Sequence, residues 1–413
     1  DLLRKQDIEL PQWISFAKVR ASIAQVGNDL EPYQLYSTYK IEKDPNGGTM
    51  ANVDNTLYSD KVRSELIKSR EVGLELRLFD NRLGFDLAWY RSNATNQLIR
   101  LPMDPASGYE AKIINAGDIQ NEGFELMITA DILRSEAFKW NAQLNLSHNE
   151  NRIIKLYQGN GQDSPVTEYD LGTYDNLQIL AREGGKYGEI WGTTFKRVED
   201  PSSPLYGKIL TDADGLPIAG EKKKLGDQQP DLLAGLTNTF SFAGFDLSFL
   251  IDARIGGKMF SGTNHALQAN GSSANTAVNG RKKFVVDGAV EKNVGGKKVY
   301  EKNTTEVTPQ DYWGAISGRS GNLGINEANV FDATNVRLRN IALSYTLPQS
   351  LLRKTPITRA KLGFSCNNVW MIKSYMNGVD PESVFATGSN ATGYEFASSP
   401  TTRSFLFNIT LGF

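Results

Sequence analysis

Residues that could carry chemistry are few in this sequence, and none has the spacing of a catalytic or metal site. Gly257-Lys258 resembles the end of a phosphate-binding loop, but Met259 follows where that loop has Ser or Thr. Asp212-Ala213-Asp214-Gly215 lacks the closing Glu of a calcium loop, so an Asp-Gly turn is the simpler interpretation. His148 and His265 have no triad neighbours, and we expect both to be solvated loop or strand-end residues.

The composition excludes several functional classes. The 413 residues include one cysteine, Cys366, and two histidines, which rules out an internal disulfide framework and leaves little material for a zinc or iron site. Lys and Arg number 45 against 47 Asp and Glu, a net charge of -2, so the basic excess that nucleic-acid binding requires is missing. We expect no cofactor, no metal and no catalytic residues.

Two adjacent aromatic residues, Tyr312 and Trp313, are the one candidate for substrate contact. They lie in a long polar segment ahead of Phe331, and exposed aromatic rings stack on sugar or peptide surfaces. Anchoring of that segment onto the protein's own barrel or onto a capping partner is at least as good an interpretation.

The elements that position these residues are β-strands, because the dominant pattern is strict two-residue alternation in segments of about ten residues. The segment 72–78 has an apolar residue at every second position, Asp80-Asn81-Arg82 makes a turn, and 83–89 returns with the same alternation. We expect about 12 to 14 such strands. No helix of convincing length is predicted, and 349–353 is at most one turn.

Connections between these strands alternate in length. Short turns are expected near Asp80-Asn81, Ser135-Glu136, Ala243-Gly244 and Pro348-Gln349, and long polar segments near 40–62, 157–185, 199–228 and 256–333. Tight turns at one end and long loops at the other are typical of an antiparallel transmembrane β-barrel of outer-membrane type. A soluble β-sandwich or propeller is the alternative, but strands of nine to eleven residues favour the barrel. No run of 18 apolar residues predicts a transmembrane helix.

The alternation also predicts which side chains face lipid. On the lipid side we expect Leu74, Leu76, Leu87, Leu126, Leu144, Leu247, Phe249, Leu343 and Ile409. On the other side, against the lumen or a plug, we expect Glu75, Asp86, Asn145, Asp246, Ser248 and Asn408. The reason is that lipid tolerates charged side chains poorly.

Several segments resemble the SusC/RagA family of TonB-linked outer-membrane proteins. The resemblance is carried, in the family's order, by 13–22 followed by 26–29, 69–75, 81–87, 115–125, 227–231, 235–240, 256–258, 336–345 and 378–382. It covers nearly the whole chain and concerns barrel architecture, so it does not identify a substrate.

The resemblance implies that residues 1–413 are the C-terminal portion of a barrel of about 22 strands. A plug domain, a TonB box and early strands would then precede Asp1, and 256–333 would be a long extracellular loop region. The implied function is TonB-dependent import of an oligomeric glycan or peptide across the Gram-negative outer membrane. The implied partners are a SusD-like surface lipoprotein, TonB, outer-membrane lipid and a second transporter–lipoprotein pair.

Two other functions remain open. A passive outer-membrane porin would need this chain to form its own smaller barrel. A secreted polysaccharide-active β-protein would need a pair of positioned carboxylates, and the sequence identifies no such pair among 47 acidic residues.

The last strand carries a predicted assembly signal. Phe405, Phe407, Ile409, Leu411 and Phe413 place five apolar side chains on one face. Chain termini usually fray, so a soluble protein gains little from such an ending. By resemblance, the terminal aromatic residue is the signal that the barrel-insertion machinery reads.

Overall fold

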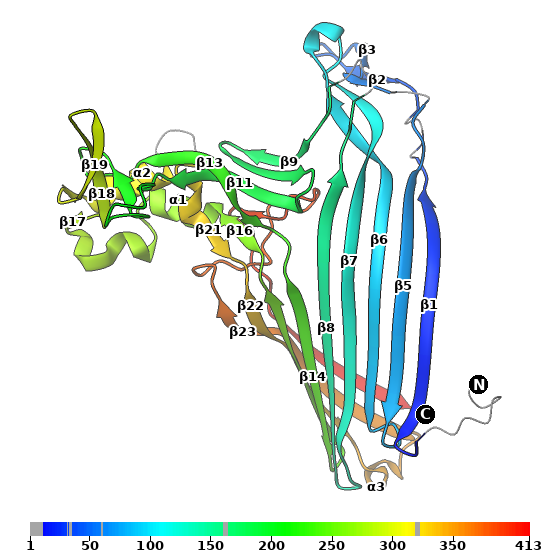
Figure 1. Cartoon of the computed structure of the whole chain (residues 1–413). Coiled ribbons are helices and arrows are strands. Elements are labelled where there is room, and N and C mark those ends of the chain that lie inside the picture. Colours follow the sequence, from blue (N-terminus) through cyan, green and yellow to red (C-terminus); the bar gives the residue numbers. More distant parts are fainter. Residues whose placement is uncertain (1–10, 31, 33–34, 59–60, 160–163, 319–322) are drawn as a thin grey trace.

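The computed structural model describes residues 11–30, 32, 35–58, 61–159, 164–318 and 323–413. Within these residues, ten long antiparallel strands form one curved sheet, the wall of the molecule (Figure 1). In order across the wall they are β1 (Ile14–Asn28), β5 (Glu65–Leu78), β6 (Leu83–Pro102), β7 (Ala111–Arg134), β8 (Phe138–Lys155), β14 (Leu232–Phe242), β15 (Phe245–Ile255), β22 (Asn335–Thr346), β23 (Arg359–Ser374) and β25 (Ser404–Gly412). The short β4 (Thr56–Leu57) pairs with β7 in parallel.

Strand register places the predicted apolar residues in continuous rows. Leu74 lies opposite Leu87, Leu87 opposite Leu126, and Leu126 opposite Leu146. The neighbouring row on the other face joins Glu75, Asp86, Met127 and Asn145. Because a one-residue slip would exchange the two faces, these pairs confirm the predicted register of the sheet. That the apolar face contacts lipid stays a prediction.

The connections at the two ends of the wall differ as expected. Short turns join β5 to β6, β7 to β8 and β14 to β15 at one end, where β1 also begins and β25 ends (Figure 1). At Ala243-Gly244 both residues have positive φ, 49° and 84°, the geometry of a two-residue hairpin turn that matches strand twist. The turn between β22 and β23 contains α3 (Gln349–Leu352), the single helical turn that the sequence predicts.

The long connections are more ordered than the sequence predicts. Residues 156–231 hold a four-stranded sheet of β13 (Ala219–Asp227), β11 (Tyr187–Phe195), β10 (Leu177–Arg182) and β9 (Glu168–Tyr174). The expectation of 12 to 14 wall strands was too high for the described residues, because strands such as β10 are short and largely buried and belong to this separate sheet. Residues 160–163 of the predicted loop lie outside the described residues.

Residues 256–333 contain strands and helices, although we expected a loop. Among the described residues, their two α-helices are α1 (Gly262–Ala269) and α2 (Pro309–Ser317). Ser261 and Thr308 cap these helices by accepting backbone N–H groups, and such short capped helices give too little periodicity for sequence detection. The strands are β16 (Lys258–Ser261), β17 (Phe284–Val285), β18 (Gly288–Val294), β19 (Lys297–Lys302), β20 (Glu306–Val307) and β21 (Val330–Asp332), with β12 (Ile209–Thr211) and β24 (Tyr394–Glu395) pairing to them from other connections. Residues 319–322 are not among those described.

We call β9 to β13, β16 to β21, β24, α1 and α2 the outer module. Its core combines aliphatic and aromatic side chains. Tyr394 stacks there on Tyr174 with ring centroids 3.9 Å apart and on Phe260 at 5.7 Å. A second buried cluster, with Ile153 of β8 and Ala181 of β10, packs the module against the wall. The module therefore lies at the end of the wall that carries the long connections, as does the hairpin of β2 (Tyr39–Lys43) and β3 (Thr49–Val53) (Figure 1). No helix in the described ranges is long and apolar enough to cross a bilayer.

The wall is open along both edges. In the described residues β1 pairs only with β5, and β25 pairs only with β23. Each edge leaves a row of backbone N–H and C=O groups without strand partners, which hydrocarbon does not tolerate. A membrane-embedded wall of this kind needs further strands to close it.

Candidate functional site: the polar face of the wall

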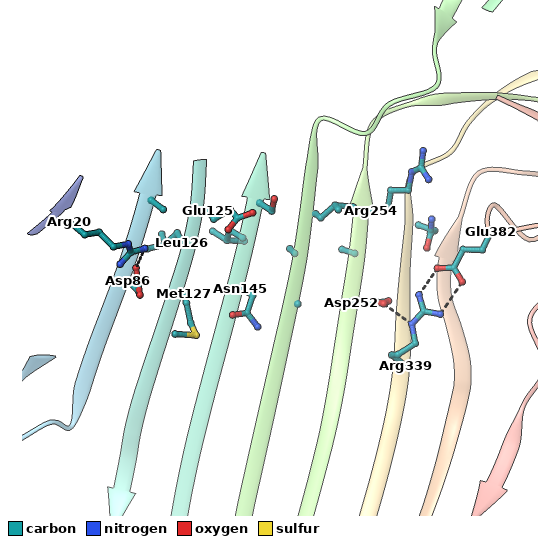
Figure 2. Close-up of a pocket in the computed structure, with 18 residues that line it drawn as sticks. Arg20, Asp86, Glu125, Leu126, Met127, Asn145, Asp252, Arg254, Arg339 and Glu382 are labelled. Atoms are coloured by element: carbon teal, nitrogen blue, oxygen red, sulfur yellow. Dashed lines mark hydrogen bonds and ion pairs between the residues drawn. The ribbon is translucent and has the colours of Figure 1, made fainter. Parts of the chain in front are cut away.

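The polar face of the wall is concave and encloses a cavity of about 640 Å³ (Figure 2). Its lining comes from seven strands, β1, β6, β7, β8, β14, β15 and β22, and from the loop that carries Glu382. The charged residues around it are Arg20, Asp86, Glu125, Asp252, Arg254, Arg339 and Glu382. The predicted lumen residues Glu75, Asp86, Asn145, Asp246, Ser248 and Asn408 all lie on this face by register.

Motif glycines allow long side chains to lie flat across this face. Arg20 passes over Gly73 to reach Asp86 at 2.7 Å and Glu71 at 3.3 Å. A Cβ at position 73 would come within 2.5 Å of the Arg20 side chain. This gives a physical reason for the glycine in the 69–75 motif: it makes room for a charge network between three strands.

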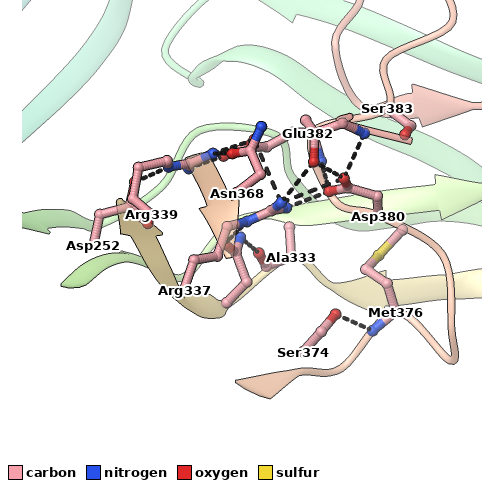
Figure 3. A network of polar contacts seen from close by, with 12 residues as sticks. Asp252, Ala333, Arg337, Arg339, Asn368, Ser374, Met376, Asp380, Glu382 and Ser383 are labelled. Carbon is pink, nitrogen blue, oxygen red and sulfur yellow. Dashed lines mark hydrogen bonds and ion pairs between the residues drawn. The ribbon is translucent and has the colours of Figure 1, made fainter. Parts of the chain in front are cut away.

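A denser network joins β22 to the loop 375–403 (Figure 3). Arg339 contacts Asp252 at 2.6 Å and Glu382 at 2.5 Å, while Arg337 binds Asp380 through both guanidinium nitrogens. The Arg337 and Asp380 side chains are only 5% and 8% exposed. Asp380 also accepts hydrogen bonds from the Thr401 backbone N–H at 3.0 Å and hydroxyl at 2.7 Å. One carboxylate thus holds both ends of this loop.

Electrostatics keep Asp380 ionised. Burial by itself would raise the pKa of Asp380, but hydrogen bonds from Arg337, from the Glu382 backbone and from Thr401 outweigh it and hold that pKa well below its usual range. A buried carboxylate with this many donors is a structural clamp, because its lone pairs are already occupied.

Some polar atoms around the cavity remain without partners. The buried Nε of Arg254 and Oδ1 of Asp252 have no hydrogen-bond partner among the described residues. Glu125 projects from β7 and forms no ion pair within the described chain (Figure 2). Since unsatisfied buried polar groups cost free energy, this face is suited to receive a polar partner surface.

The structure places Tyr312 and Trp313 in α2, inside the outer module. Tyr312 is half-buried and packs edge-on against Phe284 at 5.1 Å, and its ring contacts Trp313 at 5.2 Å. Burial raises the pKa of Tyr312. This packing is that of an anchor within the module. Trp313 remains a candidate for substrate contact.

One of the two histidines differs from expectation. His265 lies in α1, is 9% exposed, and burial lowers its pKa, so the prediction of a solvated residue was wrong. Its Nε2 has no partner among the described residues. His148 lies within β8, where its ring contacts Phe124 at 5.4 Å. The described residues contain no cluster of three metal-binding side chains. Cys366 is buried on the apolar face opposite Ile341 and Phe405.

The predicted assembly signal lies on the exposed last strand. Phe405, Phe407, Ile409 and Leu411 lie on one face of β25, and Phe407 and Phe413 are 82% and 81% exposed. Phe364 on β23 contacts Phe405 at 6.2 Å and Phe407 at 5.1 Å. This face continues the apolar face of the wall.

The Arg337–Asp380 and Arg339–Glu382 pairs are the functional contacts that the sequence did not predict. Both partners lie in motif segments, 336–345 and 378–382, but nothing in a single sequence pairs them. One signal was available, since strict alternation would place both arginines on the same face as the apolar Ile341 and Leu343, where charge is unfavourable. The register shift between Leu338 and Asn340 turns them to the concave face instead.

Comparison with known proteins agrees with this architecture. The family described as "TonB dependent receptor-like, beta-barrel" matches residues 10–203. TonB-dependent receptor P3 of Formosa agariphila is 26% identical over 96% of this chain and 39% of its own length. TonB-dependent receptor SusC of Bacteroides thetaiotaomicron is 22% identical over 94% of this chain and 35% of its own.

Solved structures show the same fold. A structure of the RagAB peptide transporter superposes with a TM-score of 0.71 at 18% identity, covering 99% of this chain and 42% of that one. The chain spans about two fifths of the length of the curated relatives it matches. Together with the open polar-lined wall, these likenesses show that the chain has the fold of a TonB-dependent receptor β-barrel and is similar in sequence to SusC-type receptors.

Proposed function

We propose that the protein to which this chain belongs imports an oligomeric nutrient, a glycan or a peptide, across the outer membrane with energy delivered through TonB. The observation that carries this proposal is the division of the wall into an apolar face and a concave, charged face with a cavity of about 640 Å³. A wall of this kind separates lipid from a polar path. The relatives named as receptors and the RagAB fold support it.

In this proposal the concave face receives a plug, and further strands close the barrel. The unpartnered Arg254 Nε and Asp252 Oδ1 and the free carboxylate of Glu125 offer hydrogen bonds to such a plug. The chain breaks and forms no bond of the cargo, because transport needs a path and an energy source rather than catalytic residues.

The outer module provides the surface for a partner. We assign it, with 256–333 as its largest part, to contact with a SusD-like lipoprotein at the extracellular mouth. The outer module projects from the wall and has its own hydrophobic core, so its surface holds a fixed shape (Figure 1). A fixed shape suits a stable protein contact. Two such transporter–lipoprotein pairs would then form the dimer that the family resemblance implies.

Energy coupling is tested by uptake in cells. The full-length protein is expressed in its host with and without TonB, and uptake of labelled oligosaccharides or peptides is measured. TonB-dependent import requires uptake to stop without TonB while the amount of inserted barrel is unchanged. A passive porin would continue to conduct, and liposome conductance of the isolated polypeptide would support that alternative.

The partner is tested by deletion in the full-length protein. Removing 270–325 takes away α2 and β17 to β20 and leaves every wall strand in place. We expect the lipoprotein to be lost from pull-downs. A variant with a shortened turn at Ser135 to Ala137, at the opposite end of the wall, is the control. Recovery of the lipoprotein at full stoichiometry after the 270–325 deletion would contradict the assignment.

A further inference from the structure

The apolar face of β5 to β8 ends abruptly in charge. Strand pairing gives a last apolar row of Val72, Trp89 and Phe124 on β5 to β7, which His148 continues on β8. The next row toward the long connections consists of Arg70, Arg91, Glu122 and Glu150. Residues two apart on a strand share a face, so these charges stand directly above the leucine rows, outside the concave path.

The height of this charged row matches the edge of a bilayer. From Leu83 to Trp89 the apolar side chains of β6 span about 20 Å along the strand, close to the roughly 25 Å apolar band of outer-membrane barrels. Tryptophan prefers the membrane–water interface. Arg91 follows two residues later, about 7 Å farther along the strand, at the level of lipid headgroups.

Cations on β5 and β6 exceed the acids that can pair with them. Arg70 lies directly opposite Arg91, an arrangement that is unfavourable for like charges. Glu122 is occupied: it accepts from Arg91 at 2.5 Å and from the Trp89 indole at 3.2 Å. Glu150 lies 3.7 Å from Arg152. No described residue forms an ion pair with Arg70 or with Lys68, which is two residues farther along β5, and both side chains are exposed.

We propose that Lys68, Arg70 and Arg91 form a binding site for a phosphate group of an outer-leaflet glycolipid of the lipid A type. A phosphate between the two arginines would remove their repulsion, and a guanidinium forms paired hydrogen bonds with phosphate oxygens. The acyl chains of the same lipid would lie along Trp89 and the leucine rows below. The proposal rests on the outer-membrane orientation proposed above and adds a ligand outside the transport path.

A lipid fits this surface better than a protein. The leucine rows continue from the charged row without a polar break, so whatever covers the cations is continuous with hydrocarbon. Free phosphate would satisfy the arginines equally but would leave the exposed apolar surface of the Trp89 ring uncovered. The cations also lie on β5 and β6, while β7 and β8 present Glu122 and Glu150, so the anion is confined to one side.

The test uses the full-length protein in detergent and native mass spectrometry. The probes are lipid A with its phosphates, dephosphorylated lipid A and inorganic phosphate. Lys68→Gln/Arg70→Gln is compared with Lys18→Gln/Lys139→Gln, which removes from the concave side of β1 and β8 two exposed cations that form no ion pair with a described residue. Arg70→Lys, which keeps the charge and loses the paired donors, is the conservative variant.

We expect lipid A binding to weaken about tenfold or more in Lys68→Gln/Arg70→Gln, as for the loss of one charge-assisted hydrogen bond. The control pair should bind normally, Arg70→Lys should be intermediate, and dephosphorylated lipid A should bind the wild type weakly. Equal losses in the two pairs, equal binding of both lipids, or saturation by inorganic phosphate alone would overturn the proposal. The proposal would also be overturned if Lys68→Gln/Arg70→Gln lost a protein partner while its binding of lipid A stayed unchanged.

The same samples separate this proposal from the proposed function. Heat-modifiable mobility shows whether each variant is an inserted barrel. If Lys68→Gln/Arg70→Gln is not inserted, the comparison is made with Arg70→Lys instead. A barrel that imports by TonB yet shows no preference for phosphorylated lipid sinks only the lipid site. A barrel that retains lipid A but takes up cargo without TonB sinks only the proposed function.

Discussion

Arg337 and Asp380 lie 43 residues apart in the sequence, and the Arg337 guanidinium donates to both carboxylate oxygens of Asp380. Because Asp380 also accepts two hydrogen bonds from Thr401, the pair closes the loop between β23 and β25 onto β22. The position of the two ends of this loop at the rim of the concave face therefore depends on this buried ion pair, whereas Tyr394 in its middle packs into the outer module.

Arg337→Met leaves Asp380 buried without its cation, which typically costs about 3–5 kcal/mol. We expect residues 375–403 to become sensitive to protease while the wall stays inserted. Limited proteolysis followed by mass spectrometry measures this. In the double variant Arg337→Met/Asp380→Leu both charges are gone, and protection should partly return. If the protease sensitivity of the double variant equals the summed effects of the two single variants, Arg337 and Asp380 act independently of each other.

Acid should release the same loop. The folded pKa of Asp380 is held below its unfolded value, so the folded state binds fewer protons and the clamp contributes fully only above the unfolded pKa. Its contribution falls as pH drops below about 3.9. Hydrogen exchange of 375–403, corrected for intrinsic rates, should rise there. Asp380→Asn should exchange fast even at pH 7, and a wild-type loop protected equally at pH 2.5 and pH 7 would contradict the clamp.

Leu126→Arg tests the predicted lipid face. Leu126 lies between Leu87 and Leu146, and an arginine there should cost roughly 2–4 kcal/mol in a bilayer. Glu125→Arg, one residue away on the concave face, is the matched control and should be tolerated. The fraction of heat-modifiable protein in outer-membrane preparations reports both. Similar losses for the two variants would mean that the faces are wrongly assigned.

The last strand should control assembly. Phe413→Ser, or removal of Leu411 to Phe413, is expected to lower the amount of inserted barrel, and any transport defect should follow from that loss. Heat-modifiable mobility is again the measurement. Thr410→Ser changes the opposite face of β25 and should have no effect. Normal insertion of the truncated protein would show that this strand is not the signal.

Trp313 and Phe284 distinguish substrate contact from anchoring. If α2 contributes to cargo binding, Trp313→Ala should lower uptake several-fold at low substrate concentration, while Phe284→Ala, which removes the ring against Tyr312, should mainly loosen the module. Uptake kinetics and proteolysis of 256–333 are measured together. Loss of protease resistance in both variants with a parallel loss of uptake would assign the aromatic residues to anchoring alone.

The sequence alone determined the wall. Two-residue alternation fixes which side of a strand is apolar, and because one face must avoid charge, the register of Leu74, Leu87 and Leu126 follows from the pattern. The tight turn at Ala243-Gly244 could also be predicted, since glycine beside a small residue permits two positive φ angles. These features are local, so neighbouring residues in the sequence suffice to specify them.

Tertiary structure decided the rest. The pairing of Arg337 with Asp380, the burial of His265 in α1 and the stacking of Tyr174 on Tyr394 depend on residues far apart in the sequence, most of them in the long connections. Their segments are polar, rich in turns and too short for a detectable period, so packing rather than local preference gives them their structure. The concave cavity likewise arises only when seven strands curve together, because each strand contributes only a few of its lining side chains.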